Sequence, residues 1–197
     1  ISLIMETQLS KLEIDYYQIN MEDQISQLNI TSVINNCVES QSISSYWCRL
    51  INRANDGTLS TSGSFVSTPL FNLSEFDTSG IDLKFTYLID TSFGELAFNN
   101  FTNILLNKDF KQDISSDQIN CKSLYRLGEE DGLCYQPSPK IQNVFNLSLA
   151  KRIFNNPSQL GLTYRYIDNV DDSQKIGTAL NIPFDSYSYF DLNFVTN

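Results

Sequence analysis

Hydrophobic and polar residues alternate one by one along much of the chain. In residues 81–89, every odd-numbered position is apolar, whereas Asp82, Lys84 and Thr86 lie between them. Successive side chains of a β-strand point to opposite faces. This segment therefore predicts a strand with one apolar face and one mostly polar face.

The same alternation recurs elsewhere and divides the chain into about seven strands. One example is the segment in which Leu160, Leu162 and Tyr164 alternate with Gly161 and Thr163. The predicted strands are residues 1–6, 11–21, 64–89, 95–110, 141–153, 160–168 and 186–196. The pattern therefore predicts an all-β protein.

The connections between these strands are alternately short and long. Short links lie near residues 6–10, 90–94 and 155–158. Long polar segments cover residues 22–64, 111–140 and 168–186. Short turns on one side of an antiparallel sheet and long loops on the other are typical of an outer-membrane β-barrel. We therefore predict a segment of an antiparallel up-and-down transmembrane β-barrel.

A water-soluble β-sandwich is the alternative, because its strands also bury one face. Three features favour the barrel: the alternating loop lengths, a polar face with charged and amide groups, and aromatic residues near the strand ends. The polar-face residues are Asp82, Lys84, Asn99, Asn103, Arg165 and Asp191. The aromatic residues are Tyr16, Tyr17, Tyr87, Phe110, Tyr164, Tyr166, Tyr187 and Tyr189. The apolar runs are too short for a transmembrane helix.

Charge and composition exclude several classes of function. The 197 residues include 13 Lys and Arg and 23 Asp and Glu, which gives a formal net charge of -10. No basic stripe is present to neutralise phosphates, so we expect no nucleic-acid partner. The chain has no histidine, which removes the Ser-His-Asp and Cys-His arrangements and the usual zinc ligand. We expect the protein not to be an enzyme and to hold no metal or cofactor.

Four cysteines lie in the long polar segments, Cys37 and Cys48 in one and Cys121 and Cys134 in another. Four cysteines allow three pairings, of which pairing within each segment is the simplest. Each such disulfide would stabilise a loop without a core of its own by about 3 kcal/mol. Disulfides here indicate an oxidising compartment, whereas the alternative is four reduced, buried thiols.

Five short stretches occur in an order that resembles a known family. They are residues 11–19 (KLEIDYYQI), residues 48–59 (CRLINR followed by DGTL), residues 77–82 (DTSGID), Cys121 with residues 134–140 (CYQPSPK), and residues 189–192 (YFDL). Their order and approximate spacing resemble the C-terminal part of TonB-dependent outer-membrane receptors. Asp77 departs from the pattern, since the family has Glu at this position.

The resemblance implies that residues 1–197 form a partial barrel domain, about a third of a wall of about 22 strands. The plug domain and the TonB-contact segment of such receptors are not in this sequence, so we expect a fragment of a longer chain or a remnant. The implied location is the outer membrane of a Gram-negative bacterium. The implied partners are the TonB complex, through the missing segments, outer-membrane lipid, and an extracellular small-molecule or oligosaccharide ligand.

The resemblance also implies energy-coupled uptake of a scarce nutrient of the siderophore, cobalamin or oligosaccharide class. We expect aromatic residues of the long loops to contact the ligand, or else to pack around the disulfides. These residues are Tyr46, Trp47, Tyr125 and Tyr135. The alternative function is a secreted, disulfide-clipped β-sandwich for adhesion or carbohydrate binding, in which Trp47 and the tyrosines stack on sugars.

Overall fold

The computed structural model describes residues 1–27, 30–111, 118–125, 136–154, 156–172 and 183–196. The chain divides into two compact units. The first consists of Ile1–Ile19, Asp77–Asp109 and Asn120–Asn197, and the second of Asn20–Phe76 and Phe110–Ile119. Most of the main sheet belongs to the first unit, and both helices belong to the second.

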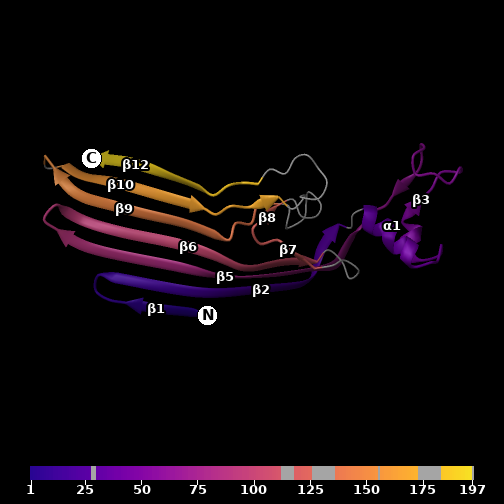
Figure 1. The fold of residues 1–197 in the computed structure, drawn as a ribbon, viewed down its shortest axis with the longest axis horizontal. Helices are drawn as coiled ribbons and strands as arrows, with labels where there is room; N and C mark the ends of the chain where they lie inside the picture. Colours follow the sequence, from indigo (N-terminus) through magenta and orange to yellow (C-terminus); the bar gives the residue numbers. More distant parts are fainter. Residues whose placement is uncertain (28–29, 112–117, 126–135, 155, 173–182, 197) are drawn as a thin grey trace. The chain divides into compact units, whose positions relative to one another are not determined.

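The protein is all-β, and its main sheet follows the order of the chain. The long strands are β1 (Ser2–Glu6), β2 (Ser10–Gln27), β5 (Leu70–Thr91), β6 (Gly94–Lys111), β9 (Ile141–Ile153), β10 (Asn156–Ile167) and β12 (Tyr187–Thr196). They lie side by side in this order, and the short strand β7 (Ile119–Asn120) pairs with β6 (Figure 1). The pairs β1/β2, β6/β9, β9/β10 and β10/β12 are antiparallel. The sheet is therefore an up-and-down meander.

These seven long strands confirm the strands predicted from the alternation, with small changes at the ends. β2 continues to Gln27, and β5 begins at Leu70 instead of residue 64. β10 includes Pro157, which has no backbone N–H to donate. The strand accepts this proline because Pro157 pairs only with Arg152 of β9, while the pairing with β12 begins at Ser158.

Local hydrogen bonds and backbone angles form the short turns. Between β1 and β2, the backbone N–H of Ser10 donates to Oγ1 of Thr7 at 3.0 Å. Between β5 and β6, Thr91 Oγ1 donates to the carbonyl oxygen of Gly94 at 2.7 Å. Gly94 has a φ of 137°, which favours glycine. The tight connections predicted at these positions are therefore present.

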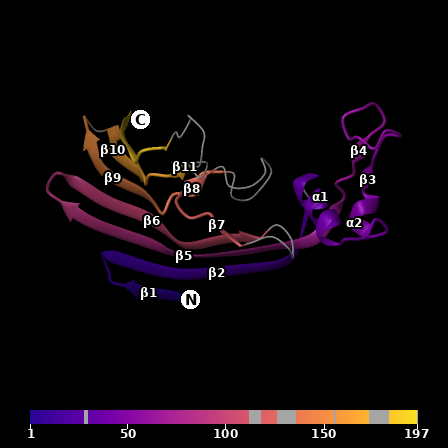
Figure 2. The ribbon, with the colours of Figure 1, turned by 45° about the vertical axis from the view of Figure 1, so that its right-hand side comes forward.

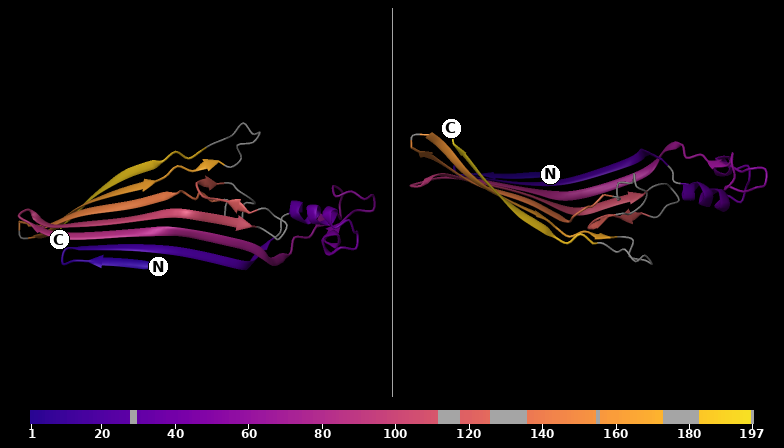
Figure 3. Two further views of the ribbon diagram at one scale, coloured as in Figure 1. Left: turned by 60° about the horizontal axis from the view of Figure 1, so that its bottom comes forward. Right: turned by 90° about the horizontal axis from the view of Figure 1, so that it is seen from above.

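The sheet of the first unit has one apolar face, on which large side chains align across four strands. The register places Leu96, Leu149, Leu160 and Phe194 in one row, and Phe98, Leu147, Leu162 and Leu192 in the next. Figures 2 and 3 show the strands of this unit as a single layer. Leu160, Phe194 and Leu192 are exposed, at 43%, 59% and 74%, and the other side chains of the two rows are half-buried.

Three polar residues interrupt this apolar face. Asn143 Nδ2 donates to Asn100 Oδ1 at 2.8 Å and to Thr102 Oγ1 at 2.7 Å. Asn100 Nδ2 donates to the same Thr102 oxygen at 3.1 Å. Because the three side chains bond one another, the apolar surroundings cost them less than they would cost unpaired polar groups.

The best-buried side chains of the first unit lie in the long connections and not on the sheet. Strands β8 (Leu124–Tyr125) and β11 (Asp171–Asp172) form a small parallel pair there. Cys121, Tyr125, Val170 and Asp172 are all at most 4% exposed. This small core gives the long connections some structure of their own.

The second unit contains the two helices, α1 (Ile30–Glu39) and α2 (Tyr46–Arg49). Ser45 caps α2, because its side chain accepts a hydrogen bond from the Cys48 backbone N–H at 3.2 Å. Strands β3 (Ile51–Asn52) and β4 (Phe65–Val66) pair antiparallel after it. The alternation of residues predicted neither helix, because both are short and lie in a mostly polar segment.

Among the described residues, no helix combines the length and the apolar character that crossing a bilayer would require.

Candidate functional site

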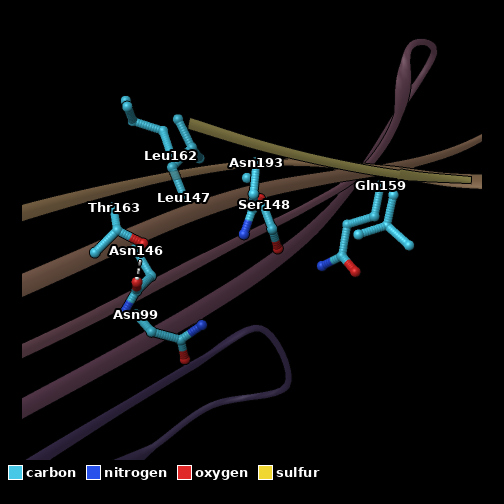
Figure 4. A pocket seen from close by; sticks show the side chains of 10 residues that line it. Asn99, Asn146, Leu147, Ser148, Gln159, Leu162, Thr163 and Asn193 are labelled. Atoms are coloured by element: carbon cyan, nitrogen blue, oxygen red, sulfur yellow. Dashed lines mark hydrogen bonds between the residues drawn. The ribbon is translucent and has the colours of Figure 1, made fainter. Parts of the chain in front are cut away.

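The polar face of the first unit contains a groove with a volume of about 340 Å³. It crosses strands β6, β9, β10 and β12, and amide and hydroxyl side chains dominate its lining. The lining residues are Asn99, Asn146, Leu147, Ser148, Gln159, Gly161, Leu162, Thr163, Asn193 and Val195. Figure 4 shows Asn99, Asn146 and Thr163 on one side of the sheet and the side chains of Leu147 and Leu162 directed to the other.

The strand register brings these polar residues together from distant parts of the sequence. Asn99 of β6 pairs with Asn146 of β9, which pairs with Thr163 of β10. In the next row, Ser148 pairs with Gly161, and Gly161 with Asn193 of β12. Paired residues share a face of a sheet, so the groove is a direct product of the register.

Gly161 leaves room in this groove for its neighbour. A Cβ atom built at Gly161 would overlap Oδ1 of Asn193. The Asn193 side chain therefore lies across the space that another residue at position 161 would fill. A larger residue at position 161 would therefore displace the Asn193 side chain from its present position.

Most of the amide groups in the groove form no hydrogen bond with the described residues. Thr163 Oγ1 donates to Asn146 Oδ1 at 2.7 Å. The side chains of Asn99, Gln159 and Asn193 form no hydrogen bond with any other described residue, and the same holds for the Ser148 hydroxyl. These groups are available to bind water or a ligand.

A second polar cluster on this face joins β2, β5 and β6. Asn103 Nδ2 donates to Asp82 Oδ1 at 2.7 Å and lies 3.4 Å from the Tyr17 hydroxyl. Nearby on the same strands, Glu13 bonds Lys11 and lies 3.5 Å from the Lys84 ammonium group. Glu13 and Lys84 are therefore paired across β2 and β5, and Asp82 is bonded to an amide of β6.

One end of the face carries two tyrosines and a guanidinium group. Arg165 Nη1 donates to the Tyr189 hydroxyl at 2.9 Å, and its guanidinium carbon lies 5.5 Å from the centre of the Tyr189 ring. The ring of Tyr187 lies 5.6 Å from that of Tyr189. Tyr189 and Asn193 share a face of β12, four residues apart.

In the second unit, the predicted pairing of Cys37 with Cys48 is confirmed by a disulfide whose Cα atoms are 4.7 Å apart. Tyr46 and Trp47 lie next to it in α2 and contact each other and Phe71. Tyr46 remains 47% exposed. These two residues therefore form an aromatic cluster beside the disulfide, and ligand contact by them stays a prediction.

The remaining predicted residues are only partly described. Tyr125 is 4% exposed, donates to Asp172 Oδ2 at 3.3 Å, and packs on Phe184 with ring centres 4.8 Å apart. This position indicates a role in the small core of the long connections. Cys121 is fully buried, whereas Cys134 and Tyr135 lie outside the described residues, so the second disulfide and contact by Tyr135 stay predictions.

The turn around Asp56 contains a carboxylate with a shifted pKa. The Thr58 backbone N–H donates to Asp56 Oδ1 at 3.0 Å, and the Thr58 hydroxyl donates to it at 2.8 Å. These two hydrogen bonds lower the pKa of Asp56 below its ordinary value.

Among the described residues, no group of three or more His, Cys, Asp or Glu could hold a metal ion.

The groove contains residues that the sequence did not single out. The alternation placed Asn99, Asn146, Thr163 and Asn193 opposite the apolar residues of their strands, but none of them was predicted to contact a ligand, and Gln159 was not assigned to a face. Their signal was their position opposite the apolar residues in each strand. Only the register shows that they meet.

Comparison of the chain with models of known families, with curated proteins and with solved structures finds no match.

Proposed function

We propose that this chain forms part of the wall of a transmembrane β-barrel in the outer membrane of a Gram-negative bacterium. The observation that carries the proposal is the single-layer meander with one long, uncovered apolar face. A soluble protein normally covers such a face, because exposed apolar patches of this extent favour association. Hydrocarbon would cover it in a membrane.

The polar face supports the same proposal from the other side. In a large barrel, lipid-facing and lumen-facing residues alternate along each strand, and the lumen is polar. Here Thr163 and Asp191 are register partners on the polar face, between rows of leucine, tyrosine and phenylalanine on the apolar face. A watery lumen would solvate such groups.

The connections add a third line of support. Short turns join β1 to β2, β5 to β6 and β9 to β10, and long segments join the strands at their other ends. Outer-membrane barrels have short periplasmic turns and longer extracellular loops. On this assignment the disulfide Cys37–Cys48 lies in an extracellular loop, where it would persist.

Within this class, we propose a TonB-dependent receptor that takes up a scarce nutrient with energy delivered through the TonB complex. The motif-like stretches support this: residues 11–19 lie in β2, residues 77–82 in β5 and residues 189–192 in β12. Residues 77–82 include Gly80, where an added Cβ atom would overlap the end of the Tyr17 side chain in its present position. The ligand would bind at the loops and the polar face, and the protein would catalyse no covalent reaction.

The alternative, a secreted β-sandwich, needs a second sheet packed on the apolar face. Within the first unit, the β-structure that described residues form outside the meander is the two-residue pair β8/β11 and the single bridge between Val170 and Phe184. That pair is too short to cover rows of side chains across four strands. The sandwich is therefore the weaker proposal.

The experiment that tests the proposal compares the 197-residue chain in detergent micelles and in buffer. We expect a monodisperse, β-rich species by circular dichroism and size exclusion only with detergent. The variant Leu162→Asn with Leu192→Asn places two polar residues on the apolar face and should weaken detergent association. Its control, Thr163→Asn with Asp191→Asn, changes the polar face and should not. A monomer that stays folded and soluble without detergent would contradict the proposal.

A further inference from the structure

We propose that the amide-lined groove of β6, β9, β10 and β12 binds a neutral oligosaccharide. The inference rests on the proposed function, because it places the polar face toward a lumen that a ligand can enter. The groove residues that carry it are Asn99, Asn146, Gln159, Thr163 and Asn193.

The chemistry of the lining favours hydroxyl-rich ligands. Each amide side chain offers both N–H donors and a carbonyl acceptor, and each sugar hydroxyl both donates and accepts. No charged side chain is among the lining residues. Asp191, the register partner of Thr163, carries the charge nearest to them in sequence on β12. Arg165, two residues from Thr163 on the same face, offsets this charge, so it is the net charge of -10 that disfavours an anionic ligand such as a carboxylate-rich metal complex.

The amides are also free to bind. Asn99, Gln159 and Asn193 form no side-chain hydrogen bond with another described residue, although Asn146 accepts one from Thr163. Amides that served only to hold the strands together would be bonded across them, as Asn143 and Asn100 are on the opposite face. The groove amides differ in this from Asn143 on the opposite face and from Asn103, which bonds Asp82 across the strands elsewhere on the polar face. We take this difference to mean that the groove amides serve something other than the fold.

The size and arrangement of the groove fit a short saccharide. Its volume of about 340 Å³ lies at the low end of the range for small-molecule sites, about 300–1,000 Å³. Side chains on neighbouring strands are about 4.8 Å apart. Asn99 and Asn146 can therefore reach two hydroxyls of one sugar ring.

An aromatic platform lies on the same face. Tyr189 shares a face of β12 with Asn193, and its ring is held by Arg165 and flanked by Tyr187. Aromatic rings combine an apolar surface with a polar tip, so Tyr189 can pack on the apolar face of a second sugar unit. The platform and the groove together extend the site along β12.

The test measures binding of defined neutral trisaccharides to the 197-residue chain in detergent micelles by isothermal calorimetry. The probes are maltotriose, cellotriose, xylotriose, laminaritriose and chitotriose, with ferric citrate as the anionic comparison. We expect at least one trisaccharide to bind, and Asn99→Leu to weaken it at least about tenfold, the effect of one or two lost hydrogen bonds. Gln159→Ala should weaken the same trisaccharide, which covers the case that Asn99→Leu does not fold.

The matched control is Asn100→Leu, because Asn100 neighbours Asn99 but lies on the opposite face. We expect it to leave the affinity unchanged. Three results would overturn the inference. The first is that no trisaccharide binds to the folded chain, and the second is that the Asn99→Leu and Asn100→Leu variants bind the trisaccharide equally. The third is that ferric citrate binds more tightly than every trisaccharide.

The failure of this inference is distinct from the failure of the proposed function. A chain that needs detergent but binds no trisaccharide keeps the barrel proposal and loses the carbohydrate site. A chain that is soluble without detergent and still binds a trisaccharide through Asn99 loses the barrel proposal and keeps the site.

Discussion

The phenol ring of Tyr17 on β2 lies over Gly80 on β5, in the space that a Cβ atom at position 80 would occupy. From there its hydroxyl comes within 3.4 Å of Asn103 on β6. Tyr17 therefore connects three neighbouring strands across the polar face. This contact depends on the one residue type that has no side chain.

Substitution Gly80→Ala should destabilise the sheet by about 1–3 kcal/mol, because the added methyl group forces the Tyr17 ring away. The free energy of unfolding in detergent, measured with urea, tests this. In a Tyr17→Leu background the ring is already absent, so the same Gly80→Ala change should cost clearly less. If Gly80→Ala lowers the free energy of unfolding equally in both backgrounds, the position of the Tyr17 ring does not depend on the missing side chain at position 80.

Reduction or removal of the disulfide Cys37–Cys48 should loosen the second unit without affecting the main sheet. The cysteines are separated by 11 residues, and closing a loop of this length contributes about 3 kcal/mol in the chain-entropy account. Limited proteolysis of Cys37→Ser with Cys48→Ser should cut within residues 30–66 faster than the parent chain. The circular dichroism of the strands should stay the same. Unchanged cleavage would contradict the prediction.

The turn around Asp56 should respond to pH in the acid range. The pKa of Asp56 is lowered in the folded protein, so the ionised form stabilises the turn at a pH above the ordinary aspartate value of about 3.9. This contribution is lost as the pH falls through the lowered pKa. The Thr58 amide resonance should titrate with a midpoint below 3.9, and Asp56→Asn should abolish the titration. A midpoint at about 3.9 would show that the two hydrogen bonds do not hold the carboxylate.

The three polar residues on the apolar face, Asn100, Thr102 and Asn143, bond one another, and substitutions can test whether these hydrogen bonds stabilise the sheet. Asn143→Leu removes the donor to Asn100 Oδ1 and one of the two donors to Thr102 Oγ1, which should cost about 1–3 kcal/mol in detergent, although Asn100 Nδ2 still donates to Thr102. Replacing all three together, with Asn100→Leu and Thr102→Val added, should recover most of that stability. Urea unfolding of both variants measures the difference. A triple variant less stable than Asn143→Leu would contradict this account.

The long strands could be predicted from the sequence because each one has its own signal. The alternation in residues 81–89 needs no partner to be recognised, and β5 contains this segment. Helix α1 was missed although its apolar residues recur at the spacing of an amphipathic helix, at Ile30, Val33, Ile34, Cys37 and Val38. The mostly polar segment 22–64 around it was assigned to a loop as a whole. Short helices of this kind depend on tertiary contacts and on the disulfide more than on propensity.

The candidate site could be predicted only in part, because it depends on pairing between distant segments. Residue Asn99 could be assigned to the polar face, but its neighbour Asn146 follows from the register of β6 and β9. Tyr125 was expected either to contact a ligand or to pack around a disulfide, and the structure shows it packed on Phe184, in a distant segment of the chain. No local pattern predicts such a contact.

The central claim is that lipid covers the apolar face, and residues 190–195 of β12 test it most directly. Each residue is replaced in turn by a spin-labelled cysteine, and its accessibility to oxygen and to a water-soluble nickel complex is measured in micelles. We predict that labels at Phe190, Leu192 and Phe194 are accessible mainly to oxygen, whereas labels at Asp191, Asn193 and Val195 are accessible mainly to the nickel complex. The account would be contradicted if labels at Phe190, Leu192 and Phe194 were accessible mainly to the nickel complex, or to neither reagent.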